Sequence, residues 1–204
     1  MLAPRMPIAI IRLADLSQAV PLAQALVNGG LTAIEFTLTN NDALGAIEAA
    51  RAALGDAASI GAGTILTAQQ AHDAIAAGAQ FLVTPTVRKD VVGEGRAQNT
   101  PVICGAFTPS EILDAWQAGA PMIKVFPVRS LGPSFIKDVL GPLPDLKLVP
   151  TGGVDLTNCA AYIRAGAYTV GIGGGVVDPR LIAAQDWVQI AQRARSFVEA
   201  CASV

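Results

Sequence analysis

Short apolar runs alternate along the chain with segments in which apolar residues recur every three or four positions. Apolar runs of four or five residues bounded by turn signals are typical of buried strands, whereas the longer spacing is typical of amphipathic helices. Because helical segments separate the runs, the strands should form βα units and pair in parallel. We predict eight strands: "PIAII" from Pro7, "AIEFT" from Ala33, "SIGAG" from Ser59, "FLVT" from Phe81, "PVICG" from Pro101, "MIKVF" from Met122, "KLVP" from Lys147 and "TVGIG" from Thr169.

The helical segments carry start and stop signals. Thr108 in "TPSE" is predicted to cap the helix "SEILDAWQA", with Glu111 placed to complete a capping box. Three helices end in "AGA", at Ala77, Ala118 and Ala165, where glycine suits a left-handed C-terminal cap. The other predicted helical segments are "LSQAVPLAQALVN", "DALGAIEAARAAL", "AQQAHDAIAA" and "NCAAYIRA".

Eight strands, seven or eight helices and no segment that resembles an interdomain linker predict an α/β fold, a single (β/α)8 TIM barrel over residues 1–204. An open doubly wound sheet is the alternative. In a barrel, catalytic groups lie at the carboxyl ends of the strands or in the loops that follow them. The position of each polar residue within its strand therefore bears on function.

Composition and net charge limit the kinds of molecule that the protein is expected to bind. Hydrophobic residues make up 52% of the chain and charged residues 15%, which excludes a disordered chain and favours elements buried on both faces. A net charge of −2 provides no general attraction to nucleic acid or to an anionic membrane, so we expect neither as a partner. An anionic ligand must be held by a local site.

Cysteine usage and the first residues bear on the compartment. Cys104, Cys159 and Cys201 are widely spaced and lack a CxxC motif, so we predict neither a disulfide framework nor a metal site. The first apolar run reaches Arg12 and Asp15 too soon for a signal peptide or a membrane span. These features predict a cytoplasmic protein.

Lys124 lies in the apolar sequence "PMIKVFP". Strand alternation places it on the same face as Met122 and Phe126, with Ile123 and Val125 on the other. If the other face meets the helices, Lys124 points into the barrel, where desolvation lowers its pKa and supplies a neutral amine for attack on a carbonyl. The alternative is a strand-end lysine that reaches solvent or pairs with a carboxylate.

Glu35 lies in the second run, between Ile34 and Phe36. A buried glutamate needs a partner or a raised pKa, and a raised pKa suits proton transfer near neutral pH. The alternative is a structural ion pair, for which Arg12 at the end of the first strand is the candidate partner.

Two glycine clusters follow the last two strands: "PTGGV" from Pro150 and "GIGGG" from Gly171. Glycine allows backbone N–H groups to approach and surround an anion, and barrels often bind phosphate after these strands. The pair of clusters therefore predicts a phosphorylated substrate.

The motifs "IEFTLT", "GAGTIL", "FLVTP", "GAFTPSE", "IKVFP", "VPTGGV" and "VGIGGG", in this order from Pro7 to about Pro179, resemble the KHG/KDPG aldolase family. These are class I pyruvate aldolases, which form a Schiff base. The resemblance implies a TIM-barrel lyase that cleaves 2-keto-3-deoxy-6-phosphogluconate, its galactonate epimer or 4-hydroxy-2-oxoglutarate to pyruvate and an aldehyde. It also implies a homotrimer that uses no cofactor or metal.

The resemblance assigns roles to individual residues. It implies that Lys124 is the Schiff-base lysine and Glu35 the general acid/base. The implied substrate-binding residues lie in the strands or in the loops after them: Arg12, Thr64, Pro85, Phe126, Thr151, Gly152, Gly153, Gly173 and Gly174. Arg12 would orient the substrate carboxylate, and the glycines would hold the phosphate.

Two positions depart from the family pattern. Some members carry arginine where Thr39 stands, so the carboxylate contact would come from Arg12. A serine often occupies the position of Gly175, and its absence removes one hydroxyl donor to phosphate. This departure predicts weaker binding of a phosphorylated substrate, or use of an unphosphorylated one.

Two other functions remain to be compared with the aldolase. A phosphosugar isomerase or epimerase would need the glycine clusters and Glu35 but no Schiff base. A non-catalytic trimeric assembly subunit would need neither. His72 and Lys147 are expected at the surface. Arg129 and Ser130, in the loop after the sixth strand, could touch the substrate, but we expect them to be solvated.

Overall fold

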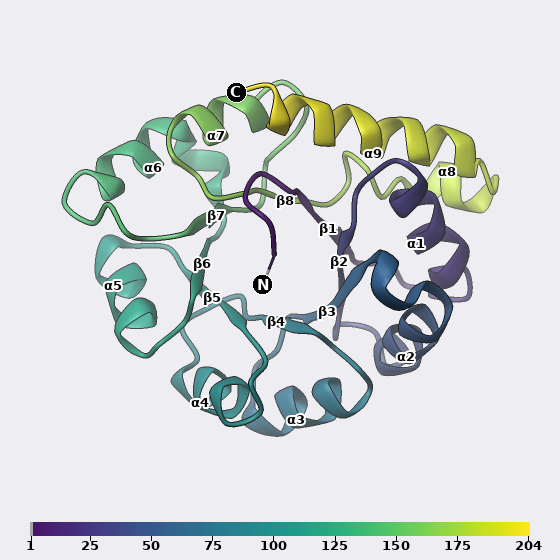
Figure 1. The fold of residues 1–204 in the computed structure, drawn as a ribbon, viewed down its shortest axis with the longest axis horizontal. Helices are drawn as coiled ribbons and strands as arrows, with labels where there is room; N and C mark the ends of the chain where they lie inside the picture. The colour runs from purple at the N-terminus through teal and green to yellow at the C-terminus, as the bar shows by residue number, and fades with distance from the viewer. Residues whose placement is uncertain (1) are drawn as a thin grey trace.

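Eight parallel strands follow one another around a barrel in the computed structural model, which describes residues 2–204 (Figure 1). They pair in the order β7-β6-β5-β4-β3-β2-β1-β8, and a bridge between Thr151 and Gly171 joins the end of β7 to β8. The predicted α/β barrel is therefore confirmed, with every predicted strand present. The strands are β1 (Ile8–Ile11), β2 (Ala33–Thr37), β3 (Ser59–Gly63), β4 (Phe81–Val83), β5 (Val102–Ala106), β6 (Met122–Val125), β7 (Leu148–Pro150) and β8 (Gly171–Ile172).

A ring of helices surrounds the strands (Figure 1). Residues 2–204 contain nine α-helices, whereas the sequence predicts seven or eight. The additional helix is present because two helices follow β8. The last of them, drawn in yellow, lies along α1 and α7. The helices are α1 (Ala19–Asn28), α2 (Ala43–Leu54), α3 (Ala68–Ala76), α4 (Lys89–Ala97), α5 (Pro109–Gln117), α6 (Gly132–Leu140), α7 (Cys159–Arg164), α8 (Pro179–Ala183) and α9 (Trp187–Ala202). Within residues 2–204, no helix combines the length and apolar character that crossing a membrane requires.

The predicted helix signals are present. The Thr108 hydroxyl accepts a hydrogen bond from the Glu111 backbone N–H at 3.2 Å, and the Glu111 carboxylate accepts one from the Thr108 N–H at 2.8 Å. The glycines of the three "AGA" sequences have left-handed φ angles, of 95°, 97° and 101° at Gly78, Gly119 and Gly166. Local sequence therefore determines where these helices begin and end.

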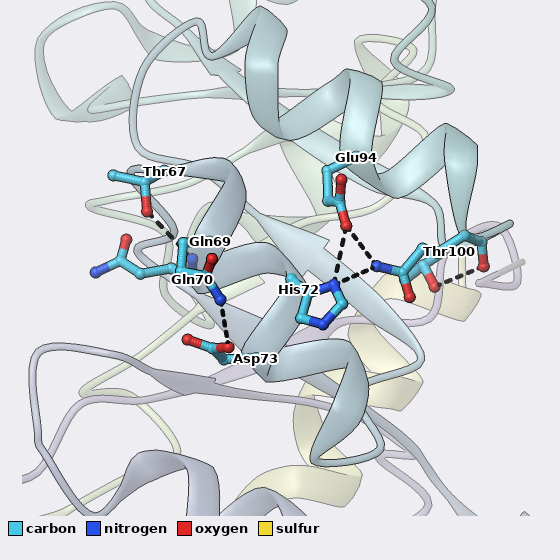
Figure 2. Close-up of polar contacts among 8 residues, drawn as sticks. Thr67, Gln69, Gln70, His72, Asp73, Glu94 and Thr100 are labelled. Atoms are coloured by element: carbon cyan, nitrogen blue, oxygen red, sulfur yellow. Dashed lines mark hydrogen bonds and ion pairs between the residues drawn. The ribbon is translucent and has the colours of Figure 1, made fainter.

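His72 lies on the outer surface, where α3 faces α4 (Figure 2). Its Nδ1 is 3.3 Å from Glu94 Oε1 on α4, and its side chain is 58% exposed. On α3 itself, Gln69 donates a hydrogen bond to Asp73 at 2.8 Å. Among residues 2–204 no three His, Cys, Asp or Glu side chains are grouped so that they could hold a metal ion. His72 is thus a surface residue, as predicted.

The apolar side chains form two clusters on opposite faces of the strands. Residues such as Ile34, Phe36, Ile123 and Val125 pack outward against the helices. A smaller cluster fills the amino-terminal half of the barrel interior: Leu2, Ile8, Ala33, Phe81, Val83, Ile103, Met122 and Val149. This packing leaves the carboxyl end of the interior for polar groups.

The N-terminal segment and the segment before β8 close the amino-terminal end of the barrel. The Tyr168 hydroxyl donates a hydrogen bond to the Leu2 carbonyl at 2.8 Å, and the Arg5 N–H donates to the Tyr168 carbonyl at 2.7 Å. Lys147, which the sequence predicts at the surface, lies at this end of the barrel. Lys147 is half-buried, and its Nζ lies 5.2 Å from the centroid of the Tyr168 ring, because this end of the barrel is covered.

Candidate active site

Lys124 points into the barrel from β6, as strand alternation predicts. Its neighbours Ile123 and Val125 belong to the outer apolar cluster, whereas Met122 belongs to the inner one. Lys124 is only 3% exposed, and its Nζ lies 5.1 Å from the centroid of the Phe126 ring. The interpretation of Lys124 as a solvated strand-end residue is therefore excluded.

Burial changes the acid–base chemistry of this amine. Desolvation lowers the pKa of Lys124, because the charged ammonium form loses its hydration. The nearby Glu35 carboxylate opposes this shift, and the Arg12 guanidinium adds to it. A larger fraction of Lys124 is therefore a neutral nucleophile than in water.

Glu35 enters the same interior from β2, where it is 1% exposed. Desolvation raises the pKa of Glu35, although the positive charges of Lys124 and Arg12 act in the opposite direction. Its Oε1 has no hydrogen-bond partner among residues 2–204. A carboxyl group with a raised pKa and a free oxygen can serve as an acid or base toward a bound molecule.

Gly63 on the neighbouring β3 makes room for the Glu35 carboxyl group. A β-carbon at position 63 would overlap Glu35 Oε1 and crowd Cδ. In the "GAGT" motif, the glycine before Thr64 therefore has a specific role: only glycine leaves the carboxyl group where it is.

A small cavity lies between Glu35 and Lys124. Its volume is about 10 Å³, close to the roughly 10–15 Å³ that one water molecule requires. Thr151 also lines it, together with apolar residues of β1, β4, β5 and β7. One small polar group can thus lie within reach of both the amine and the carboxyl group.

A larger cavity of about 770 Å³ opens above it at the carboxyl end of the barrel. Lys124 and Thr151 line both cavities, so the amine is accessible from the larger one. Eight of the residues predicted from the sequence line the larger cavity: Arg12, Lys124, Phe126, Thr151, Gly152, Gly153, Gly173 and Gly174.

Thr64 and Pro85 line neither cavity. Both are half-buried and follow β3 and β4 at the same end of the barrel. Thr64 has φ of 60°, a left-handed backbone conformation that is a genuine outlier for a β-branched residue. Such strain persists only where the surrounding structure imposes it, and it clusters at functional sites.

The two glycine clusters form one wall of the larger cavity. Gly152 and Gly153 have φ of 84° and 106°, which favours glycine. A β-carbon at Gly153 would lie 2.9 Å from the Arg129 β-carbon, whereas one at Gly174 would meet nothing within 4 Å. Backbone N–H groups in this wall can approach an anion closely.

Arg129 is a cavity residue for which the sequence left two interpretations open, a substrate contact or a solvated loop residue. It belongs to a 3-10 turn (Val128–Ser130) after β6, and its side chain lines the larger cavity beside Gly153. Its position in the loop after β6, the strand that carries Lys124, is the feature of the sequence that places it near the site. Arg129 is exposed, as expected, and it lines the cavity, which favours the alternative of a substrate contact.

Taken together, the two cavities contain an amine with a lowered pKa, a carboxyl group with a raised pKa, two guanidinium groups and a glycine wall. The amine and carboxyl group can act on a carbonyl compound. The guanidinium groups of Arg12 and Arg129 can bind anionic groups by charge-assisted hydrogen bonds. The chemistry that fits is Schiff-base formation with an anionic ketone.

Comparisons with known proteins point the same way. The sequence model of the family "KDPG and KHG aldolase" matches residues 3–193. A 2-dehydro-3-deoxy-phosphogluconate aldolase from Treponema pallidum (strain Nichols) is 37% identical over 184 residues, which cover 90% of this chain and 87% of that protein.

Two solved structures are similar over nearly the whole chain. One is a KDPG aldolase from Legionella pneumophila with pyruvate captured as a covalent carbinolamine intermediate; it is 31% identical, with a TM-score of 0.87, and the match covers 96% of this chain and 95% of that one. The other is a cube-shaped protein cage designed by fusing symmetric oligomeric domains; it is 32% identical, with a TM-score of 0.90, and the match covers 100% of this chain and 73% of that one.

Proposed function

Because this chain belongs to the KDPG and KHG aldolase family, we propose that it is a class I pyruvate aldolase that reversibly cleaves a 2-keto-3-deoxy acid. The substrate is 2-keto-3-deoxy-6-phosphogluconate, its galactonate epimer or 4-hydroxy-2-oxoglutarate, and the products are pyruvate and an aldehyde. The enzyme is a carbon–carbon lyase.

One observation carries this proposal: the buried amine of Lys124 and the buried carboxyl group of Glu35 line the same small cavity at the floor of the site. An isomerase or epimerase has no need of a desolvated lysine. The carbinolamine captured with pyruvate in the Legionella pneumophila relative is what attack of an amine on the pyruvate ketone produces. This favours the aldolase over the isomerase.

The first half of the reaction forms the Schiff base. The neutral Nζ of Lys124 attacks C2 of the substrate, and the carbonyl oxygen takes up a proton to give a carbinolamine. Glu35 in its protonated form donates the proton with which this hydroxyl leaves as water. The product is an iminium on Lys124, which draws electrons from the neighbouring C3–C4 bond.

The second half breaks the carbon–carbon bond. Glu35, now a carboxylate, accepts the proton of the C4 hydroxyl directly or through one water molecule, and the C3–C4 electron pair moves into the iminium. The aldehyde leaves and an enamine remains. Return of the proton to C3 and addition of water then release pyruvate and regenerate the free amine.

The rest of the cavity binds the two ends of the substrate. Arg12 binds the carboxylate next to the ketone, since its charge already acts on both Lys124 and Glu35. The glycine wall with Arg129 binds the phosphate of the aldehyde portion. This assignment favours a phosphorylated substrate in spite of Gly175.

Reduction of the Schiff base tests the proposal. Borohydride added in the presence of pyruvate should attach pyruvate covalently to Lys124, as seen by peptide mass spectrometry, and should inactivate the enzyme. The Glu35→Gln variant should still be modified at Lys124, although more slowly because Glu35 also assists the loss of water, and its rate of pyruvate release should fall about 10²- to 10⁴-fold. An unmodified Lys124, or modification of the exposed Lys89 instead, would refute the Schiff-base mechanism.

We also infer a homotrimer in the cytoplasm. The family resemblance supports the trimer, as do two exposed aromatic side chains in one βα unit, Phe107 and Trp116, at 37% and 42% exposure. The three cysteines are all free thiols, which fits a reducing compartment. Sedimentation equilibrium should give three times the 20.9-kDa chain mass, and a monomer mass at micromolar concentration would exclude the trimer.

A further inference from the structure

Where the backbone pairing of β1 and β2 ends, hydrogen bonds from side chains connect the two segments that follow. The last paired residues are Phe36 and Ile11, and Ile11 directly precedes Arg12 in the chain. Beyond this pair, Thr37 donates a hydrogen bond from its hydroxyl to the Ile11 carbonyl at 3.2 Å. Thr37 is itself buried, and its hydroxyl also contacts the Thr39 hydroxyl at 2.9 Å.

Asn40 extends this connection past Arg12. Its Nδ2 donates to the Leu13 carbonyl at 3.1 Å and to the Ala14 carbonyl at 2.8 Å. Its Oδ1 accepts a hydrogen bond from the Asp42 N–H at 2.8 Å, which fixes the orientation of the amide. The carbonyls on both sides of Arg12 are therefore held by side chains from the loop after β2.

The Arg12 side chain has no such support of its own. It forms no hydrogen bond or ion pair within the part of the chain that the structure describes. Its side chain nevertheless lines the larger cavity, and its charge acts on both Lys124 and Glu35. The position of the guanidinium group thus depends on the backbone of the loop that carries it.

We propose that Asn40, together with Thr37, is a positioning residue that holds the loop after β1 so that Arg12 meets the carboxylate of the 2-keto acid. This inference rests on the proposed aldolase function. Fixing the loop before the substrate binds removes an ordering cost that binding would otherwise have to offset. Misplacing a substrate-orienting group by about 1 Å costs up to about 10²-fold in rate.

A double-mutant cycle tests whether Asn40 acts through Arg12. The proteins are the parent, Asn40→Ala, Arg12→Gln and the double variant, with Asn41→Ala as the matched control. Asn41 is the exposed neighbour of Asn40 and forms no hydrogen bond in residues 2–204. Thr37→Val, which removes the hydrogen bond to the Ile11 carbonyl and the contact with the Thr39 hydroxyl, is the second test variant.

The measurement is the pyruvate concentration that gives half-maximal borohydride trapping, with the kcat for substrate cleavage measured alongside. Asn40→Ala should raise this concentration about 10-fold in the parent but less than about 2-fold in the Arg12→Gln background, because coupled residues are not additive. Thr37→Val should act in the same direction, Asn41→Ala should have no effect, and kcat should change much less than pyruvate affinity.

Three outcomes would overturn the inference. Asn40→Ala could leave pyruvate affinity unchanged, it could weaken affinity equally with and without Arg12, or it could lower kcat alone. If the Asn40 variant does not fold, Thr37→Val in the same two backgrounds decides. Failure of the aldolase proposal itself is recognisable separately, because the parent would then form no adduct at Lys124 at all.

Discussion

At the scale of single residues, the site depends on two buried groups, Lys124 and Glu35. Burial disfavours the charged form of each, so their pKa values shift in opposite directions. Burial lowers the pKa of Lys124 and raises the pKa of Glu35. Both shifts favour neutral forms, a neutral amine to attack the ketone and a protonated carboxyl group to donate. Because Lys124 and Glu35 lie on different strands, neither position in the chain reveals that they share one cavity.

This burial predicts how stability depends on pH. The folded protein holds the Glu35 proton more tightly than the unfolded chain, in which the pKa has its ordinary value of 4.5. The contribution of Glu35 to stability is thus full below pH 4.5 and is lost as pH rises through the raised folded pKa. Glu35→Gln should become more stable relative to the parent as pH rises from 4.5 to 8, measured by urea unfolding.

The matched control is Glu48→Gln, because Glu48 is exposed on α2. The difference in free energy of unfolding between Glu48→Gln and the parent should stay nearly constant from pH 4.5 to 8. A constant difference for Glu35→Gln as well would mean that Glu35 ionises as easily in the folded state as in the unfolded chain.

At the scale of elements, the loop after β8 is shaped by α9. A β-carbon at Gly175 would lie 2.8 Å from the Cζ atom of Phe197, which is fully buried on α9. The absence of a serine at position 175 therefore has a physical reason in this chain. The ring of Phe197 occupies the space that the serine side chain would need.

Gly175→Ser should accordingly destabilise the protein by about 1–3 kcal/mol, the usual cost of overpacking. Gly174→Ser is the control, since a β-carbon there meets nothing within 4 Å, and its effect should stay within about 0.5 kcal/mol. Adding Phe197→Leu to Gly175→Ser should cost less than the sum of the two single changes, as measured by chemical unfolding. Strict additivity would show that the ring does not exclude the serine.

At the scale of the whole molecule, the barrel is continuous through residues 2–204. The strands pair in an unbroken series, and the N-terminal segment is hydrogen-bonded to Tyr168 near the other end of the chain. Because each strand needs its neighbours on both sides, we propose that the chain is one folding domain.

The two tryptophans test this proposal. Trp116 on α5 and Trp187 on α9 lie in different parts of the ring of helices (Figure 1). The variants Trp116→Phe and Trp187→Phe each keep one tryptophan. For each variant, the thermal midpoint from fluorescence should equal the midpoint from far-UV circular dichroism. Separate midpoints for the two signals would indicate two units.

The sequence alone determined the order of strands, the helix caps at Thr108 and Glu111, and the placement of Lys124 on the opposite strand face from Ile123 and Val125. These follow from local rules, because strand alternation and capping involve residues only a few positions apart. The tertiary structure alone decided which residues meet. Closure of the barrel brings Glu35 into the same cavity as Lys124, leaves room for its carboxyl group at Gly63, and directs Arg129 into the cavity. It also packs Phe197 against Gly175, since such contacts depend on how distant elements pack and leave no periodic trace in the chain.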